Sequence, residues 1–472
     1  MRKTKVICTL GPSSSDEKVM KQMILAGMNV ARLNFSHNNH QGHKETIEKY
    51  RKVRDELGYS GAVLLDTKGP EVRLGDFVNG SVMLKKGQKF TLTSEEVMGD
   101  EKRASITYKK LSDLVKKDMR ILIDDGRVSL VVEEVTKKDV ICKVKNPGKI
   151  SNHKGVNIPN THLDVPYLSK VDKEDLLFGI QNDVDYVAAS FVRSKEDVKA
   201  VRNFLNKNGG KYIKVISKIE NMEGITNFGE ILKESDGIMV ARGDMGVEVD
   251  FPRLPGYQKD FIKQCNREGK IVITATQMLE SMTHSPNPTR AEISDVANAV
   301  FDGTSAVMLS GESAMGDYPL RTVKTMVKII KQAEKDALLA DLYEKIDYKA
   351  EAEDPANAIG HAACTIAADL NLPGIIAATT SGHTALRVSK YRPKQTIIAA
   401  THIKKVFHQM SLVWGVRPVK VAYSENIEEF LKEAKEFAKN TKLVRKGDMI
   451  VVTAGVPVAM EGNTNLIKIE TI

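Results

Sequence analysis

The sequence predicts an α/β protein: a TIM (β/α)8 barrel with an inserted all-β lid domain and a C-terminal α/β domain. Three observations predict this class. Strand and helix patterns alternate on both sides of a stretch that carries strand patterns with almost no helical periodicity. The same alternation resumes near the C-terminus, and the length of 472 residues suggests about three domains.

The N-terminal segment, residues 1–70, is expected to hold the first part of the barrel. Its elements are, in order, a strand at 5–10, a helix capped by the serines at 13–15, a strand at 28–35, a helix at 41–57 and a strand at 62–66. Strands that alternate with helices are typical of a parallel sheet.

Short strand patterns dominate residues 71–166, which we interpret as an inserted β-barrel lid domain. The expected strands lie at 81–84, 89–93, 120–123, 128–135 and 139–144. Asp125 and Gly126 form a hairpin-turn signal between two of these strands. The adjacent carboxylates of Asp124 and Asp125 could bind a metal ion, but turn chemistry explains them more simply.

The strand–helix alternation returns in residues 167–344, the expected second part of the barrel. Strands are expected at 184–191, 212–219, 236–241, 271–275 and 306–309, and capping boxes from Ser194 to Asp197 and from Thr289 to Glu292. With the first three strands, these five give eight strand–helix units. Eight such units favour a TIM barrel over an open sheet.

Residues 345–472 are expected to form a C-terminal α/β regulatory domain. A charged helix at 320–343 leads to a linker at 345–354, after which Asp354 caps a helix that begins with Pro355. Strands are expected at 374–378, 396–400, 416–421, 448–453 and 466–469.

Composition limits the classes of partner. Lys and Arg (70) exceed Asp and Glu (61) by nine, which suits a protein that handles phosphates or carboxylates and equally suits a Lys-rich solvated surface. No basic run is interleaved with aromatic residues, so no nucleic-acid partner is expected. The four cysteines form no C-x-x-C pair, and no apolar run approaches the length of a membrane span. We therefore expect a cytoplasmic protein with buried thiols and no membrane contact.

Polar side chains follow seven of the eight expected barrel strands, where the active site of a TIM barrel forms. Glu220 and Asp244 suit one divalent metal ion shared with substrate oxygens, and the cations Arg32, Arg73 and Lys218 suit phosphoryl charge. The backbone at Gly243 is open enough to bind a carboxylate. Asn34, Ser36, Asp66 and Thr67 supply oxygens that a monovalent cation would accept. Taken singly, each of these residues could belong to a salt bridge that closes the top of the barrel. The convergence of the whole set on one face of the barrel favours a binding site.

Six ordered segments resemble the motifs of pyruvate kinase. They are residues 28–37, 65–73, 216–224, 239–244, 273–278 and 288–292, and the resemblance extends from Lys3 through the C-terminal domain. It implies phosphoryl transfer from phosphoenolpyruvate to ADP, giving pyruvate and ATP in glycolysis, by a homotetramer. Departures are few: Met245 stands where the family more often has leucine, and residues 250–256 differ from its usual acidic segment.

The resemblance also implies roles for individual residues. The implied groups are phosphoenolpyruvate at Arg32, Lys218, Gly243, Asp244 and Thr276; the nucleotide at Asn34, Phe35, Ser36, His37, Arg73 and Lys154; Mg²⁺ or Mn²⁺ at Glu220 and Asp244; and K⁺ at Asn34, Ser36, Asp66 and Thr67. Lys218 and Arg32 would act on the phosphoryl group, and Thr276 would lie near the proton delivered to the enolate. An acidic residue at the position of Glu71 goes with K⁺ dependence in this family.

A loop in the C-terminal domain matches the family's binding site for phosphorylated allosteric effectors. It comprises Thr379, Thr380, Ser381, Gly382, His383 and Thr384, with residues 455–462 expected across from it. A loop that opens a helix in this way can cradle phosphate. A polar turn with a capped helix is an equally good interpretation, and the effector itself stays open.

Two other functions remain open at this stage. A Mg²⁺-dependent lyase or aldolase on a similar barrel would need the metal carboxylates but not Arg73, Lys154 or the lid. A catalytically idle scaffold would not need Lys218, Glu220 and Asp244 together.

Overall fold

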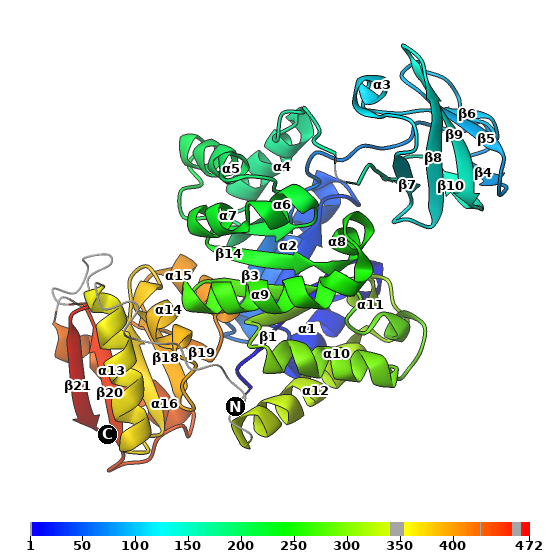
Figure 1. Ribbon diagram of the computed structural model, residues 1–472. Coiled ribbons are helices and arrows are strands. Elements are labelled where there is room, and N and C mark those ends of the chain that lie inside the picture. The colour runs from blue at the N-terminus through cyan, green and yellow to red at the C-terminus, as the bar shows by residue number, and fades with distance from the viewer. Residues whose placement is uncertain (1, 160, 340–353, 425, 456–463) are drawn as a thin grey trace.

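The computed structural model describes residues 2–159, 161–339, 354–424, 426–455 and 464–472. Figure 1 shows three parts: a barrel in the middle, a β-rich insert projecting from one side of it, and a C-terminal α/β part on another side. No helix within the described residues combines the length and the apolar character needed to cross a membrane.

Eight parallel strands close into a barrel in the order β1-β16-β15-β14-β13-β12-β3-β2. Their bounds are β1 Lys5–Thr9, β2 Val30–Asn34, β3 Ala62–Asp66, β12 Tyr186–Ala189, β13 Lys214–Ile219, β14 Gly237–Ala241, β15 Ile271–Ala275 and β16 Ala306–Leu309. The first three strands precede the insert and the other five follow it, so the predicted fold class is confirmed.

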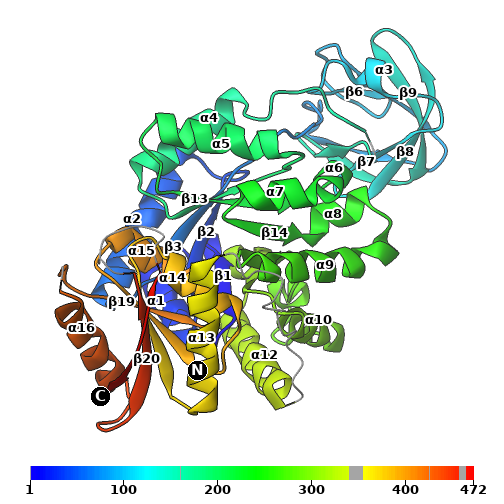
Figure 2. The ribbon, with the colours of Figure 1, turned by 60° about the vertical axis from the view of Figure 1, so that its left-hand side comes forward.

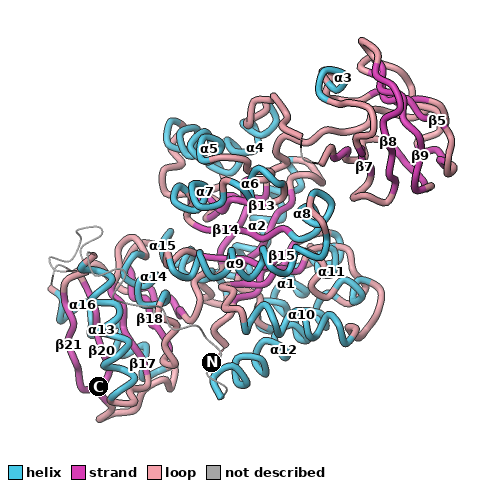
Figure 3. Tube along the Cα trace, viewed as in Figure 1, coloured by secondary structure: helices cyan, strands magenta, loops and turns pink. Residues whose placement is uncertain are grey.

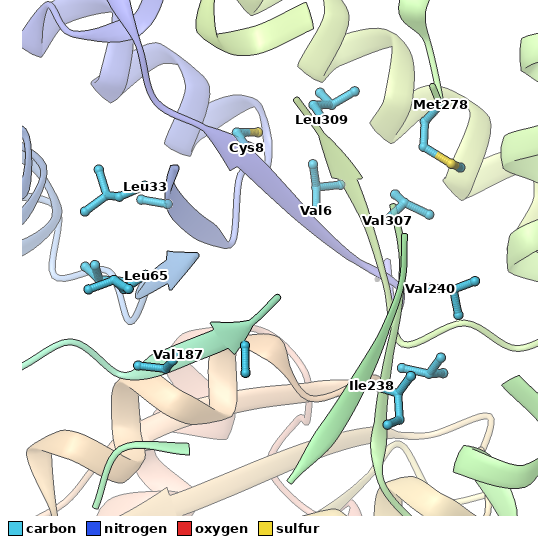
Figure 4. Packing of buried hydrophobic residues seen from close by; sticks show 14 of the residues in the cluster. Val6, Cys8, Leu33, Leu65, Val187, Ile238, Val240, Met278, Val307 and Leu309 are labelled. Atoms are coloured by element: carbon cyan, nitrogen blue, oxygen red, sulfur yellow. The ribbon is translucent and has the colours of Figure 1, made fainter. Parts of the chain in front are cut away.

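Alternation along each strand divides the side chains between two apolar layers. In β1, Val6 and Cys8 belong to the layer between barrel and helices, whereas Ile7 belongs to a cluster with the inward residues of the other strands. Figure 4 shows residues of the first layer, including Val6 and Val307, on neighbouring strands. Because both faces of every strand are covered by apolar side chains, the barrel is a packed core that holds its strand ends rigidly.

Helices surround the barrel between the strands. They are α1 Glu17–Ala26, α2 His40–Glu56, α4 Lys170–Gln181, α5 Lys195–Lys207, α6 Met222–Thr226, α7 Phe228–Glu234, α8 Arg242–Glu248, α9 Leu254–Arg267, α10 Arg290–Phe301, α11 Gly311–Ala314 and α12 Pro319–Leu339. The Thr289 capping box is confirmed, because Thr289 and Glu292 bond each other's backbone.

Two predicted caps differ in detail. The cap of α1 is Asp16, whose carboxylate accepts from Lys18 and Val19, whereas residues 12–14 form a 3-10 turn. The Asp16 carboxylate is a better cap than a serine hydroxyl because it accepts hydrogen bonds from two backbone N–H groups and carries a negative charge, which is favourable at a helix N-terminus. Ser194 does cap α5, but Asp197 accepts hydrogen bonds from Arg193 and does not complete the predicted box.

The insert forms two sheets in place of the single barrel expected from its strands. A six-stranded sheet has the order β11-β7-β8-β9-β5-β6, and β10 pairs with β4. The bounds are β4 Ser81–Leu84, β5 Lys89–Thr93, β6 Arg103–Ser105, α3 Leu111–Leu114, β7 Arg120–Ile123, β8 Val128–Val135, β9 Asp139–Asn146, β10 Gly148–Ser151 and β11 Val156–Asn157. Figure 3 shows α3 as a short helix among these strands. Leu84 and Ile150 of the smaller sheet share one apolar cluster with the larger sheet.

The C-terminal part is a five-stranded sheet with helices on both faces, visible in Figure 2. Its elements are α13 Pro355–Asp369, β17 Gly374–Ala378, α14 His383–Lys390, β18 Thr396–Thr401, α15 Lys404–Gln409, β19 Val416–Lys420, α16 Ile427–Asn440, β20 Met449–Ala454 and β21 Leu466–Thr471. Only β21 runs antiparallel to its neighbour. Asp354 caps α13 as predicted. The predicted linker at 345–354 lies outside the described residues except for Asp354.

The C-terminal part packs against the amino-terminal ends of the barrel strands. Lys5, the first residue of β1, donates to the carbonyl of Val416 at 2.6 Å, and the Tyr186 hydroxyl at the start of β12 donates to the carbonyl of Gln409 at 2.6 Å. The carboxyl ends of the strands, where the site residues were predicted, therefore lie at the opposite end of the barrel.

Candidate active site

A buried cluster of charges occupies the carboxyl ends of β2, β3 and β13. The ammonium of Lys218 lies 3.0 Å from Oδ1 of Asp66 and 3.0 Å from Oε1 of Glu220. Burial lowers the pKa of Lys218, but the carboxylates of Asp66 and Glu220 outweigh it and hold the pKa above its usual range. Lys218 therefore stays a cation at neutral pH.

Arg32 completes the cluster from β2. Its Nε donates to Oδ2 of Asp66 at 2.7 Å, and its Nη1 donates to the Thr9 hydroxyl at 2.8 Å. Burial raises the pKa of Asp66, but Arg32 and Lys218 together bring it below its usual range. Asp66 thus holds two cations in fixed orientations, which is the arrangement that recognition of a multiply charged anion requires.

Glu220 has the features of a metal ligand. Its Oε2 accepts from the backbone N–H of Phe191 at 2.6 Å, whereas its buried Oε1 lies 3.0 Å from the Lys218 ammonium without hydrogen-bond geometry. Burial raises the pKa of Glu220 to about 8; Lys218 opposes this and the nearby charge of Asp244 adds to it. A divalent cation between Glu220 and Asp244 would relieve both effects, so the residues fit a Mg²⁺ or Mn²⁺ ion.

No group of three or more His, Cys, Asp or Glu side chains suited to a metal ion exists among the described residues. A divalent ion at Glu220 and Asp244 would therefore take its other oxygens from substrate or water, as Mg²⁺ commonly does.

Gly243 and Thr276 meet at the ends of β14 and β15. The backbone N–H of Gly243 donates to the Thr276 hydroxyl at 2.8 Å, and this hydroxyl donates to the carbonyl of Ala275 at 2.6 Å. Thr276 and Gln277 have φ values of 66° and 54°, in the left-handed region that a β-branched residue rarely adopts. The turn is therefore held against its local preference.

A cleft of about 960 Å³ opens over these strand ends. Its lining includes Arg32, Asn34, His37, Gly243, Asp244 and Thr276. The structure thus brings residues at or just beyond the carboxyl ends of β2, β14 and β15 to one cavity. Lys218, Asp66 and Glu220 are 9%, 1% and 0% exposed and reach one another beneath this surface.

Four of the six residues predicted to bind the nucleotide do not line this cleft: Phe35, Ser36, Arg73 and Lys154. Arg73 donates from Nε to Glu71 at 2.7 Å and from Nη1 to the carbonyl of His153 at 3.0 Å, and Lys154 lies 2.6 Å from Asp124. Phe35 is buried and stacks on the ring of His43 at 4.2 Å. From the insert it is Asp125, at the tip of the β7–β8 hairpin, that reaches the cleft.

Of the residues predicted for K⁺, Asn34 and Asp66 are partners on neighbouring strands, and Asn34, Asp66 and Thr67 already make hydrogen bonds. Asn34 Oδ1 accepts from the N–H of Ser36 at 3.1 Å. Asp66 holds Arg32 and Lys218, and the Thr67 hydroxyl accepts from the N–H of Ser190 at 3.2 Å. A K⁺ ion here would share Asp66 with two cations.

Comparisons with known proteins agree with this geometry. The family model "Pyruvate kinase, barrel domain" matches residues 1–323, and "Pyruvate kinase, alpha/beta domain" matches residues 357–470. The chain belongs to the pyruvate kinase family. It is 48% identical over 477 residues to pyruvate kinase from Clostridium acetobutylicum and 47% identical over 474 residues to that from Clostridium perfringens, with all of each chain covered. It is 47% identical to pyruvate kinase from Staphylococcus haemolyticus, of which the match covers 81%.

The structure adds two residues to the site that sequence reasoning missed. Ser190 accepts from the ammonium of Lys218 at 2.7 Å and donates to Asp66 at 3.2 Å, and Phe191 is the N–H donor to Glu220. Both were included in the strand predicted at 184–191, but β12 ends at Ala189. Had the predicted strand ended at Ala189, Ser190 would have been counted among the polar residues that follow a barrel strand.

The predicted effector loop of this pyruvate kinase family member begins where β17 ends. Gly382 has a φ of 89°, its N–H donates to the Thr379 hydroxyl at 2.9 Å, and the Thr384 hydroxyl lies 2.9 Å from that of Thr464. Burial lowers the pKa of His383, so a neutral imidazole is favoured there. Most of the segment predicted across from the loop, residues 456–462, lies outside the described residues.

Proposed function

We propose that this chain transfers the phosphoryl group of phosphoenolpyruvate to ADP, giving pyruvate and ATP. The observation that carries the proposal is the set of two cations, Arg32 and Lys218, fixed on Asp66 beside Glu220 at the carboxyl ends of the barrel strands. Phosphoryl transfer depends mainly on positioned positive charge around the phosphoryl oxygens and needs no protein nucleophile.

In this proposal Lys218 stabilises the charge of the transferring group. Its ammonium is buried, permanently charged and held from three sides by Asp66, Glu220 and Ser190. Because the cation is already oriented, no reorganisation is needed when charge moves during the reaction. Arg32, fixed on the other oxygen of Asp66, would contact the same phosphoryl group from β2, which two strands separate from β13.

Glu220 and Asp244 would hold Mg²⁺ or Mn²⁺, and membership of the pyruvate kinase family supports a general dependence on a divalent ion and on K⁺. When bound, the divalent ion supplies charge stabilisation for phosphoryl and enolate oxygens. Asn34, Ser36, Asp66 and Thr67 are our candidates for K⁺.

The substrate carboxylate would bind at the N-terminus of α8. The N–H of Asp244 belongs to the first turn of that helix, where backbone donors favour an anion, whereas the N–H of Gly243 donates to the Thr276 hydroxyl. Thr276, whose hydroxyl is bonded to Gly243, would lie beside the carbon that is protonated.

Asn34 to His37, Arg73 and Lys154 are the proposed contacts of the nucleotide. Asn34 and His37 line the cleft, whereas Arg73 and Lys154 belong to the insert of residues 71–166. We propose that this insert closes over the nucleotide as a lid, which would bring Arg73 and Lys154 to the phosphates and exclude water. We further propose a homotetramer whose C-terminal domain binds a phosphorylated effector at residues 379–384.

The test is pyruvate formation from phosphoenolpyruvate and ADP, coupled to a dehydrogenase, with and without Mg²⁺ and K⁺. We expect pyruvate and ATP in equal amounts. Cleavage of a 2-oxo acid without ATP formation would instead identify a lyase, and no turnover with any nucleoside diphosphate would overturn the proposal.

A further inference from the structure

The turn that carries Thr276 is strained, and something in the protein must hold it. Thr276 and Gln277 both have φ values in the left-handed region, at 66° and 54°. A β-branched residue is unfavourable there, so such a conformation persists only when the surroundings impose it. The contacts around the turn identify what imposes it.

The guanidinium of Arg242 binds the backbone on both sides of this strained residue. Its Nε donates to the carbonyl of Ala275 at 3.2 Å, and its Nη2 donates to the carbonyl of Thr276 at 2.6 Å. These are the carbonyls that precede and follow the Thr276 Cα atom in the chain. Two bonds from one rigid planar group therefore set the orientation of both peptide planes at Thr276.

Arg242 is itself anchored from the helix layer. Its Nη1 donates to Oδ1 of Asp295 on α10 at 2.7 Å and reaches Oε1 of Gln258 on α9 at 3.4 Å. The Arg242 side chain is 10% exposed and that of Asp295 is 35% exposed. Since an ion pair with further hydrogen bonds restricts movement, the guanidinium is a fixed reference for the turn.

The chain also links Arg242 directly to the hydroxyl of Thr276. Gly243, the next residue, donates its N–H to Thr276 Oγ1 at 2.8 Å. The backbone of residues 242–243 and the side chain of Arg242 therefore hold Thr276 at its carbonyl and at its hydroxyl.

We propose that Arg242 is a positioning residue that holds Thr276 in its left-handed turn, so that the Thr276 hydroxyl, bonded to the Gly243 N–H, keeps a fixed place at the ends of β14 and β15 beside the substrate. This inference rests on the proposed function, because it assigns Thr276 and Gly243 to the substrate. Arg242 makes its contacts with the protein, and its effect on the reaction passes through Thr276.

A double-mutant cycle tests this dependence. Arg242→Gln removes the paired carbonyl contacts and is expected to lower kcat by about 100-fold, as a displacement of about 1 Å at a reacting group can do. Thr276→Ala removes the hydroxyl through which Arg242 is proposed to act. In the Thr276→Ala background, Arg242→Gln should then lower kcat by less than about 5-fold, because interacting residues are not additive. Equal losses in both backgrounds would overturn the proposal.

Asp295→Asn is the milder variant, in case Arg242→Gln does not fold. It keeps the shape of the anchoring side chain and removes its charge, so kcat should fall by about 3- to 10-fold, again only when Thr276 is present.

Arg202→Gln is the matched control. Arg202 donates to one backbone carbonyl, of Glu234 at 3.2 Å, and to one carboxylate, of Asp236 at 2.7 Å, away from the cleft. It should leave kcat unchanged.

A crystal structure of Arg242→Gln separates this inference from the proposed function. We expect Thr276 to leave the left-handed region and the Gly243 N–H to part from the hydroxyl. An unchanged turn would overturn the inference even if the wild-type protein is fully active. An inactive wild-type protein would overturn the proposed function, whatever the conformation of the turn.

Discussion

The ammonium of Lys218 lies 3.0 Å from Oδ1 of Asp66, and Arg32 binds the other oxygen of the same carboxylate at 2.7 Å. One carboxylate from β3 thus orients cations from β13 and β2. Because Glu220 lies beside them, two cations and two carboxyl groups are buried together. Removing one member leaves its partners without compensation, which makes this cluster the first place to test the site.

Lys218→Met is expected to lower kcat by about 1,000-fold or more, because a preorganised cation aimed at developing charge is lost. Steady-state pyruvate release measures the effect. The matched control is Lys214→Met, which removes a lysine from the amino end of the same strand, where it pairs with Asp236 at 3.4 Å. If Lys218→Met retained more than about a tenth of wild-type activity, Lys218 would have no direct role in phosphoryl transfer.

The raised pKa of Glu220 lets us predict how the Mg²⁺ concentration needed for activity depends on pH. Burial raises its pKa to about 8, so below that pH a metal ion must displace a proton from the carboxyl group. The Mg²⁺ concentration for half-maximal activity should therefore fall as pH rises from 6, by up to about tenfold per unit, and level off above 8. Activity measured over Mg²⁺ concentration at several pH values gives this curve.

Glu134→Gln, on strand β8 of the insert, is the control for that experiment and should leave the curve unchanged. Glu220→Gln should raise the Mg²⁺ requirement at every pH and abolish its pH dependence below 8. A half-maximal Mg²⁺ concentration that does not change between pH 6 and 8 in the wild-type protein would contradict the assignment of Glu220 as a ligand.

Much of the barrel site was predictable from sequence because a strand pattern also gives the position of the strand's end. Arg32, Asp66 and Lys218 were found in this way, and the structure brings them together. Ser190 was missed because the strand pattern extends past the true end of β12 at Ala189. Nothing in the apolar pattern marks the residue at which a chain turns.

The insert and the caps were predicted less well, for a different reason. Strand β11, Val156–Asn157, and strand β6, Arg103–Ser105, are too short for an alternating pattern to emerge. The cap of α1 was assigned to serines although Asp16 holds it, because several residues in that segment have the chemistry of a cap. The contacts of Arg242 join residues from four elements, and sequence spacing contains no such information.

Because residue 71 is a glutamate, we predict that activity depends on K⁺ and that the substitution Glu71→Lys removes this dependence. Its half-buried carboxylate is bound by Arg73, and Asp244 contributes to its electrostatic environment. Glu71→Lys would supply a fixed ammonium that replaces the monovalent cation which the family resemblance implies. We expect the wild-type protein to lose at least about tenfold in kcat/KM when Na⁺ or a bulky ammonium ion replaces K⁺, as loss of one stabilising charge predicts, and Glu71→Lys to show no such dependence.

Glu71→Gln is the control for that experiment, because it removes the carboxylate without adding a cation. It should remain dependent on K⁺ or lose activity altogether. A wild-type protein that is equally active with and without K⁺ would contradict the inference from Glu71.

From His408, which lies between the barrel and the C-terminal part, we predict that the protein loses folding stability as pH falls. Its Nδ1 lies 2.9 Å from the carbonyl of Ser60, in the loop before β3, while no described residue bonds its buried Nε2. Burial lowers the pKa of His408 to about 4, and the charge of Arg54 acts in the same direction. The folded protein therefore keeps this imidazole neutral at pH values where an unfolded chain protonates it.

The sign of the effect follows from proton uptake. Between the unfolded pKa of 6.5 and the folded pKa of about 4, the unfolded chain binds more protons, so stability falls as pH falls through this range and is unaffected above it. The loss amounts to at most about 3 kcal/mol at pH 4. Thermal unfolding from pH 8 to 4 should show a shallower decline for His408→Gln than for the wild-type protein, whereas His284→Gln, which removes an exposed histidine, should follow the wild type. Parallel curves for wild type and His408→Gln would mean that His408 titrates normally.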